Sequence, residues 1–340
     1  MAADITSRLS VVIPAFDAAP WLPATLDALA VALREAAQEG EVVVVDDGST
    51  DDTIPVVERL SADYPVPLRL VSQPNRGRFL ARWAGVEAAR YERLLLLDAR
   101  VVVDADAFRH VARHPDVAAW NGHVRTDSST PLVGRFWEVP THVFWRRYLR
   151  RPAPVEITAE SFDALPKGTG FLLVPREAYR RAALAAWPDE GTAHLVSDDT
   201  KILRGLVAEL PLRLDPGFAA TYRPRVTVGA FLRHAFGRGT LFIDSYAGTS
   251  VVRDVVLVAL VVLPPVALGV AVALAVSGAW AALGLLLAVV VAGLLALPLG
   301  AAVNSAPARA ILSYLVYVLP FGAVFWAGLA RGLVGHRRAF

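Results

Sequence analysis

Apolar residues in the first hundred positions recur in short runs separated by helical patterns. Helical patterns cover residues 22–33, 53–60 and 78–91. In the first of them, Leu22, Leu26, Leu29 and Leu33 recur at steps of three and four. Four runs rich in β-branched residues or leucine predict buried parallel strands at 9–13, 41–45, 68–71 and 94–97. Strands that alternate with helices predict an α/β fold, a mostly parallel sheet with helices on both faces.

The last third of the chain has a different pattern. Three apolar stretches of about 20 residues each are long enough to cross the roughly 30 Å of a bilayer's hydrocarbon core; they are 255–276, 281–301 and 311–329. Arg309 is the one charged side chain between 255 and 330. We expect two to four transmembrane helices and prefer three, although three would place the basic tail opposite to the side where Lys and Arg usually remain.

These patterns divide the chain into four parts. They are a catalytic or binding domain at 1–228, an interfacial amphipathic segment at 229–253, transmembrane helices at 254–332 and a basic tail at 333–340. The N-terminus has no basic region before its first apolar run and no small-residue cleavage site, so it is not expected to be a secretory signal. The predicted location is therefore the cytoplasmic membrane, as a multi-pass protein with the first domain in the cytosol.

Composition removes several classes of function. The chain has 340 residues, a net charge of +2 and no cysteine. Without cysteine, neither disulfides nor a zinc–thiolate site can form. A net charge this small does not indicate nucleic-acid binding, and the basic residues gather near the apolar region, where we expect membrane lipids as partners.

Ligands of an open α/β sheet bind beyond the carboxyl ends of its strands. In this sequence those ends are 14–17, 46–49 and 98–100, and each is polar or acidic. The segments VVIPAFDAAPWLPATLDAL, VVVVDDGSTDDT, NRGRFLARWAGVEAA and LLLLDAR follow one another with ordinary loop lengths. In this order they resemble the family 2 glycosyltransferases, over roughly residues 9–240. The resemblance implies a GT-A fold and a nucleoside diphosphate sugar as donor.

The first two strand ends would bracket the nucleotide. The resemblance implies that Pro14, Phe16 and Asp17 line the base, and that Asp46 or Asp47 accepts hydrogen bonds from the base or the ribose. The alternative is that the two acids only cap the turn into the next helix.

Arg82 is placed by the resemblance near the diphosphate, which a guanidinium can bind. An arginine on an exposed helix face is the alternative.

Two acidic triplets compete for a metal. The family's Asp-x-Asp lies directly at the end of the fourth strand, which selects Asp98 over the later pair Asp104 and Asp106, interpreted as a helix cap. Mg²⁺ or Mn²⁺ is the implied cofactor. However, Arg100 stands where the second acid would be. Either Asp98 alone anchors the metal with help from the diphosphate and a later histidine, or Arg100 takes over part of the metal's role by pairing with phosphate.

Asp198 and Asp199 precede a helical pattern and resemble the family's acidic pair, in which the second acid takes the proton of the acceptor hydroxyl. We therefore expect Asp199 to be the base and Asp198 to support it. The alternative is an N-terminal helix cap.

Two further segments resemble acceptor or diphosphate contacts. Gly168, Thr169 and Gly170 would let a sugar approach the backbone. His234 and Arg238 would contact diphosphate or metal, and an interfacial amphipathic helix explains the same pattern.

Residues 141–151, THVFWRRYLRR, interleave aromatic residues with arginines. This pattern is typical of a surface that meets anionic headgroups or a lipid-linked phosphate, and also of a solvated basic helix.

The functional hypothesis is a membrane-bound inverting glycosyltransferase that moves a sugar to a hydroxyl of a lipid-linked or cell-surface glycan. A second hypothesis keeps the fold and makes polyprenyl phosphate the acceptor. A third is a catalytically silent domain that binds a sugar nucleotide or a partner enzyme.

Overall fold

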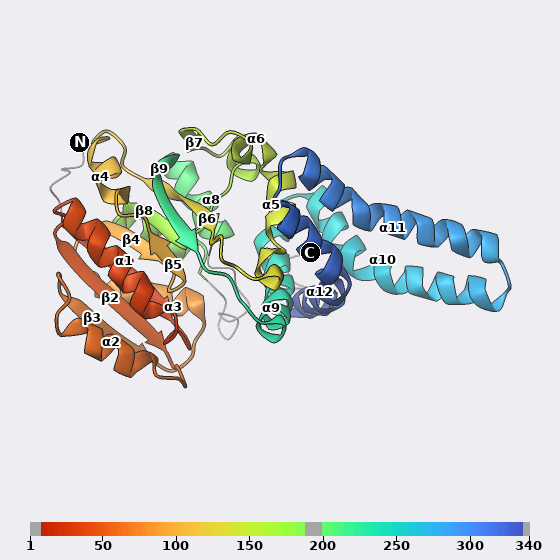
Figure 1. Ribbon diagram of the computed structural model, residues 1–340, viewed down its shortest axis with the longest axis horizontal. Helices are drawn as coiled ribbons and strands as arrows, with labels where there is room; N and C mark the ends of the chain where they lie inside the picture. Colours follow the sequence, from red (N-terminus) through yellow and green to blue (C-terminus); the bar gives the residue numbers. More distant parts are fainter. Residues whose placement is uncertain (1–7, 188–198, 336–340) are drawn as a thin grey trace. The chain divides into compact units, whose positions relative to one another are not determined.

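The structure is a computed structural model that describes residues 8–187 and 199–335 (Figure 1). These residues divide into two compact units. The first unit is drawn from 1–128 and 151–224, and the second from 129–150 and 225–340. Residues 129–150 thus belong to the second unit together with the apolar C-terminal region. The domain expected at 1–228 was contiguous and did not separate these residues.

The first unit is built on one sheet, in the order β3-β2-β1-β4-β8-β6-β9-β5, with β7 paired to β9. Strands β3, β2, β1 and β4 are parallel, and β8 joins β4 antiparallel. The strands are β1 (Leu9–Ala15), β2 (Gly40–Asp47), β3 (Leu68–Gln73), β4 (Arg93–Leu97), β5 (Val101–Val103), β6 (Trp120–Thr126), β7 (Val155–Ile157), β8 (Phe171–Pro175) and β9 (Leu212–Tyr222). The four strands and three helices expected in the first hundred residues are confirmed.

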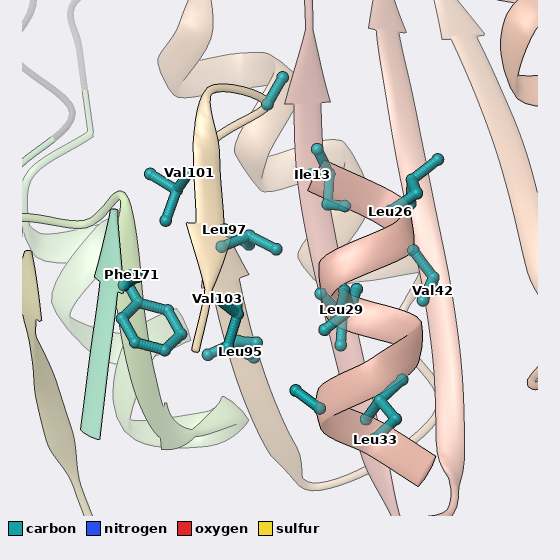
Figure 2. Packing of buried hydrophobic residues seen from close by; sticks show 14 of the residues in the cluster. Ile13, Leu26, Leu29, Leu33, Val42, Leu95, Leu97, Val101, Val103 and Phe171 are labelled. Carbon is teal, nitrogen blue, oxygen red and sulfur yellow. The ribbon is translucent and has the colours of Figure 1, made fainter. Parts of the chain in front are cut away.

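Helices cover both faces of this sheet. They are α1 (Leu22–Glu35), α2 (Thr53–Ser61), α3 (Arg78–Ala88), α4 (Ala107–Ala112), α7 (Arg176–Ala185) and α8 (Thr200–Glu209), with a short 3₁₀ turn η2 (Phe162–Ala164). In β1, Ile13 faces α1 and packs with Leu26 and Leu29 (Figure 2). The neighbouring Val12 points to α3 instead, where it lies against Gly85. Because helices cover both faces, the inner strands β1, β2 and β4 are mostly apolar on both sides rather than alternating.

The second unit contains η1 (Leu132–Arg135), α5 (Glu138–Phe144), α6 (Arg146–Leu149), α9 (Val228–Tyr246), α10 (Val251–Val276), α11 (Trp280–Val303) and α12 (Ala308–Gly335). The helices α10, α11 and α12 contain the three apolar stretches and are long and apolar enough to cross a membrane. Val133 of η1, Phe136 just after it and Val139 of α5 pack in one cluster with Ala301 of α11 and Tyr314 of α12.

Proline inside α10 leaves a carbonyl without its usual helical donor. Pro265 has no N–H, so it cannot donate to Val261, four residues earlier. The indole N–H of Trp326 in α12 donates to this Val261 oxygen over 2.8 Å. A neighbouring helix therefore satisfies the freed carbonyl, as proline-containing membrane helices require.

We expect Trp326→Phe to destabilise the second unit by about 1 kcal/mol, since phenylalanine keeps the apolar packing but removes the donor to the Val261 carbonyl. The full chain in detergent, unfolded by heat or SDS, would report the change. Trp280→Phe is the matched control, because that indole is 68% exposed. Equal stability of the two variants would contradict this role for Trp326.

Candidate functional site

The loops after β1 and β2 are tied to each other at the carboxyl edge of the sheet. The backbone N–H of Asp17 donates to Ser49 Oγ over 3.0 Å, and Asp17 Oδ1 accepts from the backbone N–H of Thr50 over 2.8 Å. Asp17 has φ +47°, an uncommon conformation for a residue other than glycine. Because its carboxylate is used to hold the second loop, Asp17 shapes the place where the base is expected.

Asp46 and Asp47 are both buried, and both brace loops. Asp46 Oδ1 accepts from the N–H of Ser49 over 3.2 Å. The Asp47 carboxylate accepts from Gln73 Nε2 and from the backbone N–H groups of Arg76 and Gly77, over 2.7, 2.9 and 3.0 Å. The turn-capping contact of Asp46 is thus present, while Asp47 fixes the loop that leads into α3. Contact of either acid with a nucleotide remains a prediction.

Two apolar residues of the first strand end have different positions. Pro14 is part of β1 and lies opposite Val45 of β2. Phe16, the residue directly after β1, has a side chain that is 51% exposed. An exposed aromatic ring beside polar strand ends is suited to stacking on a nucleobase.

Asp98 forms an ion pair with a fully buried arginine. Arg82 Nη2 donates to Asp98 Oδ1 over 2.8 Å, and Arg82 Nη1 donates to Thr169 Oγ1 over 2.9 Å. The Arg82 side chain is 0% exposed and that of Asp98 is 30% exposed. The alternative of an exposed helix face is therefore wrong for Arg82. Its guanidinium lies on the buried side of Asp98 and holds one carboxylate oxygen in place.

Gly170 is required by the same carboxylate. The N–H of Asp98 donates to the Gly170 carbonyl over 2.9 Å. A Cβ at Gly170 would lie 2.8 Å from Asp98 Oδ2, so any other residue there would displace the carboxylate that Arg82 holds. This explains one glycine of the 168–170 segment by its contact with Asp98, whereas a Cβ at Gly168 would meet open space. The N–H of Gly168 donates to Asn121 Oδ1 over 3.0 Å.

Arg100 lies over an indole ring. Its guanidinium carbon is 4.0 Å from the ring centroid of Trp21, the residue before α1, and the guanidinium of Arg223 is 5.4 Å from the same ring. Arg223 donates to the Trp21 carbonyl and to Thr25 Oγ1 over 2.6 and 2.9 Å. Burial lowers the pKa of Arg223. Two cations therefore meet at the end of β4.

Trp21 and Arg223 were not among the site residues expected from the sequence. Arg223 is 123 positions beyond Arg100 (223 − 100) and reaches it because β9 pairs with β5, where Tyr222 lies opposite Val101. This pairing between distant segments has no local sequence signal.

The residues at the end of β4 do not fit a divalent ion held by protein groups. Within 8–187 and 199–335, no group of three or more His, Cys, Asp or Glu side chains is placed to hold a metal. Asp98 already binds one guanidinium, and Arg100 brings another cation to the place of the second acid. A like charge at that position disfavours a metal ion.

Asp199 occupies the N-cap of α8. Its Oδ1 accepts from the Thr200 hydroxyl over 2.9 Å and from the Thr200 backbone N–H. The cap interpretation is therefore realised in the structure, and a role as base remains a prediction. Asp198, its expected supporting acid, lies outside the described residues.

Lys167 is a further titratable group near this helix. Its ammonium donates to the Leu165 carbonyl over 3.1 Å and lies 4.1 Å from the Phe162 ring centroid. Burial lowers the pKa of Lys167 to about 8, an effect that the charges of Asp163 and Asp199 partly oppose. The lysine therefore loses its charge as the pH rises through about 8.

His234 and Arg238 belong to the second unit, on one face of α9. Arg238 Nε donates to His234 Nε2 over 3.3 Å, and its guanidinium lies 5.2 Å from the Trp137 ring centroid. Contact of this pair with diphosphate remains a prediction.

The helix-cap interpretation of Asp104 and Asp106 needs correction. Asp106 stands at the N-cap position of α4, but its side chain makes no capping hydrogen bond and pairs with Arg109. Asp104 pairs with Arg125. Both acids form exposed ion pairs instead of caps.

Comparisons with known proteins agree with this fold. Residues 10–122 match the family model described as glycosyl transferase family 2. A poly-β-1,6-N-acetyl-D-glucosamine synthase of Staphylococcus epidermidis is 26% identical over 113 residues, 32% of this chain and 27% of the synthase. An uncharacterised glycosyltransferase of Escherichia coli (strain K12), YibD, is 31% identical over 94 residues, 28% of this chain and 26% of its own length. The chain thus covers about a quarter of the curated relatives it matches.

One solved structure is similar over nearly the whole chain. A mannosyltransferase from Pyrobaculum calidifontis, PcManGT, in complex with GDP-Man and Mn²⁺, is 22% identical with a TM-score of 0.58, and the match covers 99% of this chain and 90% of that one. This likeness confirms the expected GT-A fold followed by a helical region.

Proposed function

We propose, from the premise that residues 10–122 form a family 2 glycosyl transferase domain, that the chain is a membrane-bound inverting glycosyltransferase. It would transfer a sugar from a nucleoside diphosphate sugar to a hydroxyl of a lipid-linked or cell-surface glycan, with the first unit at the cytosolic face of the cytoplasmic membrane. The observation that supports this proposal is that Arg82 holds Asp98 and Thr169 together at the end of β4. The neighbouring strand β1 ends beside it and leads to the exposed ring of Phe16.

The donor site would use two kinds of contact. Phe16 offers an exposed ring to the base, and the braced loop with Asp46 and Asp47 offers carboxylate acceptors to the ribose or base. Asp98 keeps one oxygen, Oδ2, on the side of Gly170, while Arg82 holds the other. The names of relatives support the donor class: PcManGT is described with GDP-Man.

The charge of the diphosphate would be met by guanidinium groups. Arg100 and Arg223 bring two cations to one indole, and an arginine can pair with two phosphate oxygens at once. The description of PcManGT includes Mn²⁺; with Arg100 at the place of the second acid, guanidinium groups would here take over the charge that such an ion neutralises.

The transfer step needs one base and no covalent intermediate. The acceptor hydroxyl oxygen attacks the anomeric carbon, its proton passes to a carboxylate, and the bond from that carbon to the phosphate oxygen breaks. The nucleoside diphosphate leaves with the bonding electrons, and the attack from the opposite side inverts the anomeric centre. Asp199 is the proposed base.

A phosphate acceptor is the second candidate, favoured by the contacts of Asp199. The Asp199 carboxylate caps α8 through two hydrogen bonds from Thr200. A polyprenyl phosphate is already ionised and needs no base, so the cap would then be the whole role of this acid.

Transfer of radiolabel from a panel of UDP- and GDP-sugars into membranes tests the proposal. We expect incorporation that EDTA changes less than twofold, because guanidinium groups meet the diphosphate charge. Arg100→Asp should lower transfer and make the remainder sensitive to EDTA, while Arg125→Asp, at an exposed pair with Asp104, is the matched control. Wild-type transfer abolished by EDTA and restored by Mn²⁺ would contradict the role of Arg100.

A further inference from the structure

The helix α12 begins at one end of the hairpin formed by α10 and α11. Its residues Ala310 and Tyr314 pack in one cluster with Ala301 of α11 and Val139 of α5. Ala301 is about 3 Å from the last residue of α11, at a rise of 1.5 Å per residue. The helix α11 returns beside α10 after a short turn, so its end is level with the start of α10 (Figure 1).

The later part of α12 contacts α10 near that same end. Trp326 is bonded to the Val261 carbonyl, and Leu329 packs against Leu257. Trp326 lies about 27 Å along α12, whereas Val261 and Leu257 lie only about 15 Å and 9 Å from the start of α10. A helix crossing the bilayer beside α10 would be about 27 Å deep at Trp326, and deeper still at Leu329. The contacts become shallower instead, so α12 does not run to the far end of the hairpin.

Besides these contacts with α10, α12 packs mainly against α9 over this part. A Cβ at Gly239 would lie 2.3 Å from the Phe325 carbonyl oxygen, and a Cβ at Gly328 would lie 2.2 Å from that of Phe236. Thr240 Oγ1 also donates to the Gly328 carbonyl over 3.2 Å. The two glycines bring the backbones of α9 and α12 together, as small residues do in membrane helices. On another side, α12 exposes apolar side chains, among them Leu312, Leu315, Val316 and Leu319.

A cationic segment lies at the same depth. Val143 of α5 is beside Gly300 of α11, where a Cβ would be 3.5 Å from Val143 Cγ2. Gly300 is about 5 Å from the end of α11. Phe144, the residue after Val143, is therefore expected near the boundary between hydrocarbon and headgroups. Phe144 is 67% exposed.

Three exposed arginines follow Phe144: Arg146, Arg147 and Arg150. The sequence from 139 to 155 contains no acidic residue, and within the described part of the chain these three guanidinium groups have no carboxylate partner. Three uncompensated cations beside an exposed aromatic ring, at the end of a membrane-spanning hairpin, are complementary to an anionic lipid surface.

We propose that the α10–α11 hairpin alone crosses the membrane, and that α12, α9 and the α5–α6 segment form a surface in the headgroup region of one leaflet, where Arg146, Arg147 and Arg150 bind anionic phospholipid. Both ends of α12 then lie on the side where α10 begins. This topology keeps Arg331, near the end of α12, on the side where α10 begins, and so removes the conflict that three crossings create for basic residues.

The topology is tested by single cysteines, which the sequence permits because it has none. Thr249→Cys marks the start of α10, Ser277→Cys marks the hairpin turn, and Val334→Cys marks the end of α12; all three positions are exposed. Full-length variants in sealed membranes are treated with an impermeant maleimide before and after permeabilisation. We expect Val334→Cys to be labelled together with Thr249→Cys and opposite to Ser277→Cys. Labelling together with Ser277→Cys would overturn the proposal.

The lipid contact is tested by a fluorophore on Phe144→Cys in the full chain, reconstituted into vesicles of phosphatidylcholine with or without phosphatidylglycerol. We expect a blue shift with the anionic lipid that is weakened by salt and lost when Arg146, Arg147 and Arg150 are all changed to glutamine. The same change at the exposed Arg34, Arg59 and Arg113 is the control and should leave the shift intact. A spectrum insensitive to lipid charge would overturn the lipid assignment and point to a protein partner.

Discussion

Asp199→Asn is expected to lower the rate of sugar transfer to a hydroxyl acceptor by about 10²- to 10⁴-fold, the contribution of a positioned general base. Asparagine caps a helix as well as aspartate does, so α8 and its contacts with Thr200 should remain. The substitution therefore separates the base from the cap. The measurement is the initial rate of transfer at saturating donor, together with the thermal stability of the full chain.

The control for this experiment is Asp163→Asn, which changes an exposed acid paired with Arg204 and should leave the rate within about twofold. If Asp199→Asn keeps full activity and stability, Asp199 acts as a cap alone. That result would contradict the hydroxyl acceptor and favour the polyprenyl phosphate acceptor.

Asp98→Ala is expected to destabilise the first unit by about 3 kcal/mol, because removing one member of a buried pair leaves the other charge in a low-dielectric interior. Arg82 is 0% exposed and would keep Thr169 but lose its carboxylate partner. The expected value lies at the low end of the range for buried pairs, since Asp98 itself is 30% exposed. Transfer activity should be lost as well.

The matched control is Asp104→Ala. Asp104 also pairs with an arginine, Arg125, but both side chains are at least 36% exposed, and exposed pairs contribute about 1 kcal/mol or less. Thermal unfolding of the full chain in detergent, followed by tryptophan fluorescence, compares the two. Equal destabilisation by Asp98→Ala and Asp104→Ala would contradict a stabilising buried pair between Arg82 and Asp98.

The parallel part of the fold could be predicted because each strand carries its own signal. Runs such as the four valines of β2 are apolar on both faces and end at polar residues, so strands, helices and the edge with the ligand site follow from local pattern. Asp98 could be singled out as the expected metal or diphosphate ligand because it directly follows β4. The number of nearby acids alone would not distinguish it from Asp104.

The contacts that give those residues their environment could not be predicted. The burial of Arg82 depends on β8 lying antiparallel beside β4, which brings Thr169 and Gly170 from far along the chain. The position of Arg223 depends on the pairing of β5 with β9. The contacts of α12 are a third case: its apolar length does not reveal that Gly239 and Gly328 bring α9 and α12 together, or that Trp326 bonds to Val261 of α10.

The central claim is that the ends of β1, β2 and β4 bind a nucleoside diphosphate sugar. Calorimetric titration of the purified full chain with UDP- and GDP-sugars tests it most directly. We expect saturable binding of at least one donor, kept in Asp199→Asn and lost in Asp98→Ala. Absence of binding to every nucleotide sugar, with and without Mn²⁺, by a protein that is folded would contradict it.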